Sequence, residues 1–269
     1  MQIMAVEAIA EGRPHPAPAQ SPGPPGLEAL GDHKPGLEQL GLEPHDLQRI
    51  RAILRQPLGL VLVAGPRQSG RSTTLAAMLP AVTASDAALL LDPPASWSAL
   101  RGALGTIVQG RRVFACLTLE RAAHVFGHFR QRGLSPAALA RDLLLVLAQQ
   151  RVRRLCTACR EPDHSADVRN VLAQAANSWL EDTVRETFSA RPGGCPRCSG
   201  TGYAGCALAY ELLAVDSAVR AMAEQDAVGL DMEQALFSDG RSLWDQGLRL
   251  VARGTSSLAA LRAAVREPC

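Results

Sequence analysis

Four cysteines form two pairs, Cys156 with Cys159 and Cys195 with Cys198, each with two residues between its members. Two intervening residues let a tight turn direct both thiolates at one ion, and two such turns complete the tetrahedral shell of a structural zinc. The alternatives are two disulfides or free buried thiols. Seven cysteines, an odd number, and no signal peptide are typical of a reducing compartment, which disfavours disulfides. We therefore predict one zinc ion held by these four residues.

A glycine-rich loop from Gly65 to Ser72 fits the pattern G-x-x-x-x-G-[K/R]-S. The apolar run 58–64 before it predicts a buried strand, and residues 73–79 after it predict a helix ended by Pro80. This order of elements places backbone N–H groups and a helix N-terminus around a phosphate, with Ser72 placed to meet Mg²⁺. The candidate nucleotide ligands are Gly65, Ser69, Gly70, Arg71, Ser72 and Thr73.

One position of the loop departs from the usual pattern, because Arg71 stands where such loops carry lysine. A guanidinium keeps the charge but is a broad planar fork, whereas an ammonium is a compact point charge. The alternative to a working phosphate site is a glycine-rich turn that no longer binds nucleotide. The chain has one lysine, Lys34, against twenty-seven arginines, so a general arginine bias is a second explanation of Arg71.

A carboxylate at the end of a second strand normally accompanies such a loop, where it positions Mg²⁺ or the attacking water. The apolar run 87–91 predicts that strand, and Asp92 at its end is the candidate catalytic carboxylate. Two prolines, Pro93 and Pro94, follow at once and end the strand. The alternative for Asp92 is an ordinary turn residue.

From about residue 37 to 267 the chain resembles the C-terminal motor domain of type II secretion and type IV pilus assembly ATPases. The matching stretches are 40–42, 55–66, 150–156, 200–205, 210–213, 242–247 and 254–257. The resemblance implies an α/β fold: a P-loop NTPase (RecA-like) core with a small tetracysteine zinc subdomain and C-terminal helices. The corresponding division is a Pro-rich flexible linker over 1–36, the core over 37–150, the zinc element over 151–205 and a helical subdomain over 206–269.

Catalytic signatures of that family are altered in this chain. Arg71 replaces its lysine, Asp92 is one methylene shorter than its glutamate, and Thr118 stands in the histidine position of the strand 109–120. From the resemblance we expect the chain to lack two further features of the family: the acidic box ahead of the strand 87–91, and the preceding domain with its trans-acting arginines. The pattern predicts a pseudo-ATPase that binds ATP and Mg²⁺ with weak or no hydrolysis. The alternatives are a slow but active ATPase and a zinc-stabilised interaction module without nucleotide.

The resemblance also implies partners and a location. They are secretion or pilus motor subunits, inner-membrane platform proteins and an active paralogue, in a homo- or hetero-hexamer, in the cytoplasm or peripheral at the inner membrane. A net charge of +2 gives no strong attraction to nucleic acid. A zinc-ribbon DNA reader using Arg151, Arg153 and Arg154 is the rival reading, but interleaved aromatics are missing, so no nucleic-acid partner is expected. No apolar run approaches the roughly 18 residues of a membrane span.

Further local patterns predict helices. Apolar positions 47, 50 and 54 share one face of a helix over 45–55, and Ser135 is a predicted N-cap of a helix from Pro136 that continues through the apolar run 143–148. A helix over 166–188 is expected between the cysteine pairs. The remaining cysteines and the histidine pair four residues apart are expected to be packing or surface residues: Cys116, Cys206, Cys269, His124 and His128.

Overall fold

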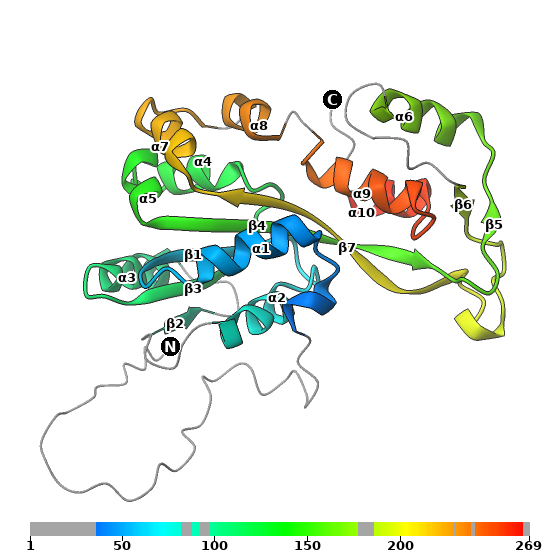
Figure 1. Ribbon diagram of the computed structural model, residues 1–269, viewed down its shortest axis with the longest axis horizontal. Helices are drawn as coiled ribbons and strands as arrows, with labels where there is room; N and C mark the ends of the chain where they lie inside the picture. The colour runs from blue at the N-terminus through cyan, green and yellow to red at the C-terminus, as the bar shows by residue number, and fades with distance from the viewer. Residues whose placement is uncertain are drawn as a thin grey trace, which may run out of the picture.

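A computed structural model describes residues 36–81, 88–91, 97–176, 186–228, 230–237 and 240–265. Its centre is a five-stranded sheet with strand order β2-β3-β1-β4-β7 (Figure 1). The first four strands are parallel, and β7 pairs antiparallel with β4. The strands are β1 (Gly59–Ala64), β2 (Ala88–Leu91), β3 (Arg112–Leu117), β4 (Leu143–Leu155) and β7 (Tyr203–Ala214). The α/β class expected from the sequence is confirmed.

Helices cover both faces of this sheet. One face is covered by η2 (Leu37–Leu40), α1 (Pro44–Leu54), α2 (Arg71–Met78) and η3 (Leu79–Ala81). The opposite face is covered by α3 (Trp97–Ile107), α4 (His124–Arg130), α5 (Pro136–Asp142), α7 (Ser217–Glu224) and α8 (Leu230–Phe237). None of the helices in the described ranges is long and apolar enough to cross a membrane.

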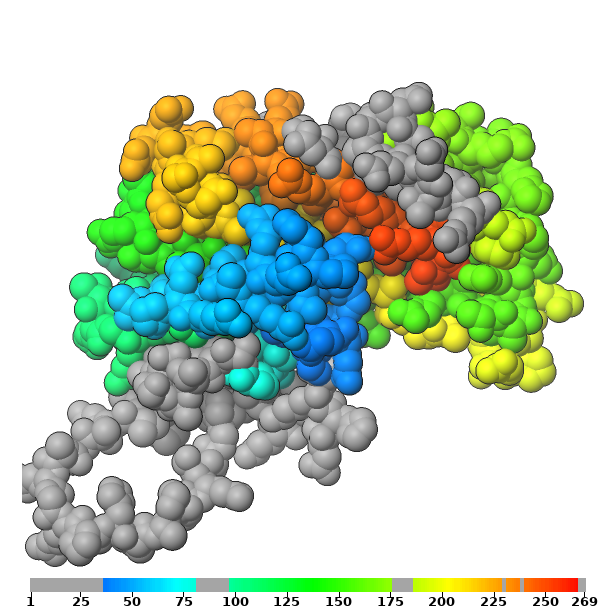
Figure 2. Space-filling view, in the orientation of Figure 1, coloured from blue at the N-terminus to red at the C-terminus, as the bar shows by residue number. Residues whose placement is uncertain are grey.

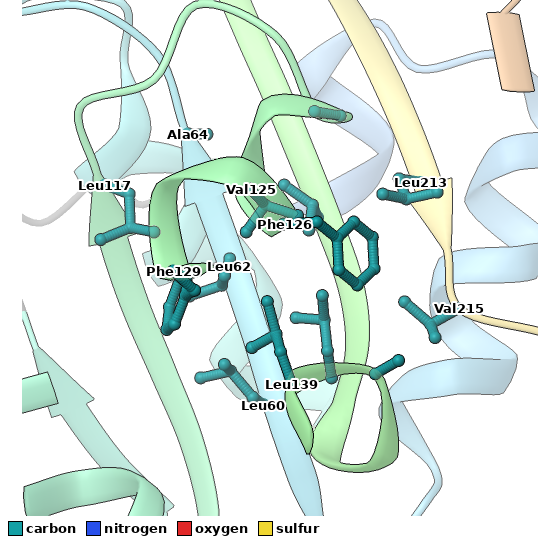
Figure 3. Packing of buried hydrophobic residues seen from close by; sticks show 14 of the residues in the cluster. Leu60, Leu62, Ala64, Leu117, Val125, Phe126, Phe129, Leu139, Leu213 and Val215 are labelled. Atoms are coloured by element: carbon teal, nitrogen blue, oxygen red, sulfur yellow. The ribbon is translucent and has the colours of Figure 1, made fainter. Parts of the chain in front are cut away.

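Strand β1 lies at the centre of two hydrophobic layers, and all six of its residues are buried. Leu60 and Leu62 face the layer that contains Phe126 and Phe129 of α4 (Figure 3), whereas Val61 faces α1 and α2. A central parallel strand is covered on both faces, so its sequence is continuously apolar and does not alternate. This packing fixes the carboxyl end of β1, where the glycine-rich loop begins.

Strands β4 and β7 extend beyond the rest of the sheet and carry a second core. Val152 and Ala209 pack there against α6 (Ala166–Ala176), α9 (Leu243–Ala252) and α10 (Leu258–Ala264). Beyond them lie the short antiparallel strands β5 (Glu161–Pro162) and β6 (Phe188–Ser189) and the turn η4 (Pro196–Cys198) (Figure 1). The two long strands therefore run continuously from the main sheet to the cysteine pairs.

The N-terminal end of the described chain returns to the C-terminal helices. In the space-filling view η2 and α1 (blue) lie against α9 and α10 (orange to red) (Figure 2). An ion pair at 2.6 Å joins Arg253, at the end of α9, to Glu43, at the start of α1. This contact closes one side of the space beside the glycine-rich loop.

Two expected helices differ from the structure. The run 143–148 is the start of β4 and not a continuation of α5, which ends at Asp142, although Ser135 caps α5 as expected by accepting a hydrogen bond from the Ala138 N–H. The helix expected over 166–188 is α6, which ends at Ala176, and Phe188 belongs to β6. In contrast, the helix expected over 45–55 and the strands expected over 58–64 and 87–91 are confirmed as α1, β1 and β2.

Candidate functional site

The glycine-rich loop joins β1 to α2 and has an unusual backbone conformation. Gly65, Gln68 and Gly70 all have positive φ, at 151°, 65° and 88°. A Cβ on Gly65 would lie 2.4 Å from both the carbonyl oxygen of Gln149 and the Oγ of Ser69, so only glycine fits there. Gln68 is not a glycine and adopts the left-handed conformation at a cost of about 1–2 kcal/mol. Gln68 therefore takes a backbone conformation that non-glycine residues rarely adopt.

The Arg71 side chain, which is 9% exposed, turns inward and binds the protein itself. Its Nη1 donates to the carbonyl oxygens of Gly65 at 2.7 Å and Leu117 at 2.8 Å, and to the Oγ1 of Thr118 at 2.9 Å. Leu117 ends β3 and Gly65 follows β1, so the guanidinium joins the carboxyl ends of two adjacent parallel strands. Arg71 and Thr118, two of the three positions at which the sequence was expected to depart from the family pattern, are thus in direct contact.

A second side chain supports the loop from β4. Gln149 is fully buried, and its Nε2 donates to the Ser69 carbonyl oxygen at 2.7 Å. Among the described residues, the Oε1 of Gln149 and the Oγ of Ser69 are buried and have no hydrogen-bond partner. Unpaired buried polar atoms are costly, so these two atoms mark a place where a ligand group or water would gain hydrogen bonds.

A cavity of about 490 Å³ opens beside the loop and the N-terminus of α2. This size is within the usual range of small-molecule sites. Three of the candidate nucleotide ligands line it, Ser69, Gly70 and Thr73, whereas Gly65, Arg71 and Ser72 do not. Within the described chain no side chain caps α2 at Gly70, so the first N–H groups of the helix lack that partner.

Three arginines also line the cavity: Arg151 and Arg154 from β4, and Arg253 after α9. Cys206 of β7 lies among them, and Arg151 donates to its sulfur at 3.5 Å. Nothing in the sequence predicts that these residues meet the loop, because their position depends on the pairing of β4 with β7, which sets Arg151 opposite Leu208. Cys206 is therefore a cavity residue. Asp92, the candidate catalytic carboxylate, lies outside the described residues.

The four paired cysteines come together at the far end of β4 and β7. All four sulfurs lie within 4.8 Å of one another, with 3.9 Å between Cys156 and Cys195 and 3.8 Å between Cys159 and Cys198. Four thiolates at about 2.3 Å from a tetrahedral zinc are separated by about 3.8 Å. A disulfide needs about 2.05 Å, so the four are free thiols and the disulfide alternative is wrong. The donor set fits a metal ion.

Backbone groups prepare one of these thiols as a ligand. The N–H groups of Cys195 and Gly202 donate to the Cys198 sulfur at 3.1 and 3.2 Å, which lowers the pKa of this thiol to about 6. Burial raises the pKa of the Cys159 thiol to about 12, with hydrogen bonds to its neighbours adding to the rise. Four thiolates this close repel one another, so a cation is required to hold all four deprotonated.

The turn around the second pair depends on Gly194. A Cβ there would lie 2.5 Å from the Gly200 carbonyl carbon, 2.7 Å from the Gly202 nitrogen and 2.8 Å from the Cys198 sulfur. The segment of the first pair is held near the C-terminal helices, since Arg160, which follows Cys159, stacks over the Phe188 ring at 3.9 Å and donates to the Gly254 carbonyl oxygen at 2.6 Å. The cysteine turns are thereby fixed to the rest of the molecule.

A buried carboxylate joins three further elements near the sheet. Glu211 of β7 is fully buried, accepts from the backbone N–H groups of Ala122 at 2.8 Å and Leu243 at 3.0 Å, and pairs with Arg121 at 2.5 Å. Arg121 also pairs with Glu233 of α8 at 2.6 Å. Desolvation raises the pKa of Glu211, and Arg121 with the two amides opposes that rise. Glu211 therefore positions the loop after β3 and the start of α9.

The chain thus combines an α/β sheet, a glycine-rich strand–loop–helix turn and a distant tetracysteine cluster. The family model for the Type II/IV secretion system protein matches residues 32–94 and 99–263, and the chain belongs to this family.

Curated relatives carry the same assignment. The type II secretion system protein HxcR of Pseudomonas aeruginosa is 30% identical over 274 residues, which is 86% of this chain and 54% of the relative. The type II secretion system ATPase E of Vibrio cholerae is 27% identical over 86% of this chain and 53% of its own length. The chain thus spans about half the length of these relatives.

Solved structures support the fold. The pilus retraction motor PilT with bound ADP has a TM-score of 0.59 at 15% identity, over 88% of this chain and 68% of that one. The Legionella pneumophila ATPase DotB has a TM-score of 0.54 at 12% identity, over 85% and 64%. At these identities the likeness concerns the fold.

Proposed function

We propose that this chain is a nucleotide-binding subunit of a secretion or pilus motor that hydrolyses ATP weakly or not at all. The observation that carries the proposal is the inward-turned Arg71, whose Nη1 is bound to Gly65, Leu117 and Thr118. The loop amides, the uncapped N-terminus of α2 and the adjoining cavity support retained binding at a degenerate P-loop. Family membership supplies the cellular context.

The loss of hydrolysis follows from what phosphoryl transfer requires. The reaction depends almost entirely on positioning and on stabilising charge at the transferring phosphate. A lysine in the loop reaches the β- and γ-phosphates as a mobile point charge, but the Arg71 fork is tied to three protein oxygens. The Thr118 hydroxyl accepts one of those hydrogen bonds, so this side chain helps to hold Arg71 and does not contact a substrate.

The tetracysteine cluster is proposed to hold structural zinc. Its donor set and sulfur separations fit a closed tetrahedral site without an open coordination position, which favours a structural over a catalytic role. The partners proposed on the basis of the relatives are motor subunits, an active paralogue and inner-membrane platform proteins, in a hexameric assembly at the cytoplasmic side of the membrane.

The test is phosphate release by the purified chain, at concentrations that permit hexamers, beside the variant Arg71→Lys. We expect no detectable turnover from the wild type and none from the variant, because restoring lysine leaves Thr118 in place. Robust wild-type turnover would overturn the proposal in favour of an active ATPase. Absence of nucleotide binding at millimolar concentration would overturn it in favour of a zinc-stabilised interaction module.

A further inference from the structure

We propose that the cavity beside the glycine-rich loop selects a nucleoside diphosphate without Mg²⁺, with Arg151 as the cation that binds its phosphates. This inference rests on the nucleotide binding proposed above and adds the ligand class and the residue that recognises it. It follows from three independent features of the site: an arginine beside a helix N-terminus, two buried atoms in need of partners, and a blocked strand edge.

The first feature is the position of Arg151. Its Cδ lies 3.7 Å from where a Cβ on Gly70 would be, so the side chain overlies the first turn of α2. Its Nη2 contacts the Cys206 sulfur, a weak acceptor, at 3.5 Å, and no carboxylate of the described residues pairs with it. The guanidinium therefore lies next to the positive end of the helix dipole, and no negative charge of the described residues balances the two. A phosphate placed between them would satisfy both.

The second feature concerns the side of the cavity formed by Ser69 and Gln149. Both residues line it, both are buried, and the Ser69 Oγ and Gln149 Oε1 have no partner within the described chain. The Gln149 Nε2 is committed to the Ser69 carbonyl oxygen, so the Oε1 can only accept. A ligand that brings hydroxyl or amine donors together with phosphates fits this requirement, and a nucleoside phosphate has both. Inorganic phosphate lacks the base and ribose that carry such donors in a nucleoside phosphate.

The third feature limits the number of phosphates. In a loop of this kind the terminal phosphate and its Mg²⁺ lie toward the carboxyl end of the neighbouring strand, where catalysis occurs. Here Arg71 occupies that edge, bound to Leu117 and Thr118 at the end of β3. Neither Arg71 nor Ser72 lines the cavity. A third phosphate at this edge would meet a guanidinium whose Nη1 is already bound to protein oxygens, whereas binding of a diphosphate in the cavity does not depend on that group.

The experiment is calorimetric titration of the full chain with ADP and with ATP, each with and without Mg²⁺. The variant Arg151→Gln is compared with Arg169→Gln, which removes an equal charge from the exposed surface of α6 away from the cavity. We expect ADP to bind without Mg²⁺ at least as tightly as ATP with Mg²⁺. We expect Arg151→Gln to weaken ADP binding about tenfold, the effect of losing one charge-assisted hydrogen bond, and Arg169→Gln to leave it unchanged.

The outcomes separate this inference from the function on which it rests. Tighter binding of ATP with Mg²⁺ than of ADP would overturn the inference and leave nucleotide binding standing. Equal ADP affinity in wild type and Arg151→Gln would overturn the role of Arg151. Failure of every nucleotide to bind would remove both proposals. Because Arg151 is exposed on its strand, the far-ultraviolet circular dichroism of the variant should match the wild type.

Discussion

The glycine-rich loop and the tetracysteine cluster are two sites of one fold whose side chains are arranged in opposite ways. At the cluster all four ligand residues are present, and the sulfurs lie where a tetrahedral ion would need them. At the loop the backbone shape is kept, but the cation points into the protein and not into the cavity. In this structure the cluster gathers four possible ligand atoms, whereas the charged side chain of the loop is bonded to the protein itself.

Both sites depend on glycines at which a side chain would collide with backbone atoms. Gly65 lies against the Gln149 carbonyl, and Gly194 lies against the backbone of Gly200 and Gly202. The loop therefore keeps its shape for steric reasons that are independent of catalysis. The shape of the loop is therefore explained by packing alone. Whether the loop can do chemistry depends on the direction of the Arg71 side chain.

The largest expected effect comes from breaking the cluster. Cys159→Ser removes one thiolate from the closed shell, and metal binding supplies much of the folding free energy of so small an element. We expect faster hydrogen exchange across the described parts of 151–205, near-unchanged exchange in β1 and β3, and a zinc content well below one equivalent. Cys206→Ser is the matched control, since Cys206 lies outside the cluster. Equal zinc content in the two variants would contradict the assignment.

The next effect comes from the buried carboxylate. Glu211→Ala leaves the Ala122 and Leu243 amides without an acceptor and removes one partner of Arg121. We expect a loss of about 3 kcal/mol in unfolding free energy, measured by urea denaturation, because the remaining buried groups are uncompensated. The exposed ion pair of Arg262 with Asp167 is the comparison, and Asp167→Ala should cost much less, because solvent screens an exposed pair. Similar losses in both variants would show that Glu211 is not a structural centre.

Glu211 also makes the stability of the protein depend on pH, in a direction that its burial determines. Desolvation raises the folded pKa of Glu211 above its ordinary value of 4.5, so the folded state binds the proton more tightly than the unfolded state. Stability from this group is therefore present below pH 4.5 and decreases as pH rises through the folded pKa. Burial also raises the pKa of Asp245, so this carboxyl group changes stability in the same direction. In urea titrations above pH 4.5, Glu211→Gln should flatten this decrease, and an unchanged slope would exclude Glu211 as its source.

A smaller effect is expected from the loop itself. Arg71→Lys replaces the guanidinium, whose Nη1 reaches three oxygens, with an ammonium of different shape. We expect a decrease of about 1–2 kcal/mol in unfolding free energy without nucleotide, from hydrogen bonds that are lost or lengthened. Chemical denaturation measures it, and Arg67→Lys, at an exposed loop position, is the control. A stabilised lysine variant would argue against the structural role of Arg71.

The sequence predicted the local elements well where flanking residues defined them. The strand–loop–helix order around Gly65 and the cap at Ser135 both depend on neighbouring residues. The helix predicted over 143–148 was wrong, because these residues begin a strand. A strand buried on both faces is apolar throughout, so its hydrophobic pattern does not distinguish it from a buried helix. The end of the helix expected over 166–188 was also wrong, because Phe188 pairs with Pro162 in a two-stranded sheet.

The features of the site that could not be predicted depend on contacts far apart in the chain. Arg71 binds Leu117 and Thr118, which are 46 and 47 residues away, so its direction depends on the pairing of β1 with β3. Arg151 reaches Gly70 only because β4 carries it past the loop. In contrast, the cysteine spacing predicted the cluster, because two short turns place four sulfurs with little help from the rest of the fold.

The most direct test of the structural role of Arg71 is a double-mutant cycle between Arg71→Met and Thr118→Val, measured by urea unfolding without nucleotide. Thr118→Val removes the hydroxyl at nearly constant volume, so the cycle isolates the bond between the guanidinium and the Oγ1. We predict a coupling energy of about 1 kcal/mol, as expected for a hydrogen bond to a charged group at a partly exposed site. A coupling energy indistinguishable from zero would contradict the account, because the Thr118 hydroxyl would then take no part in holding Arg71.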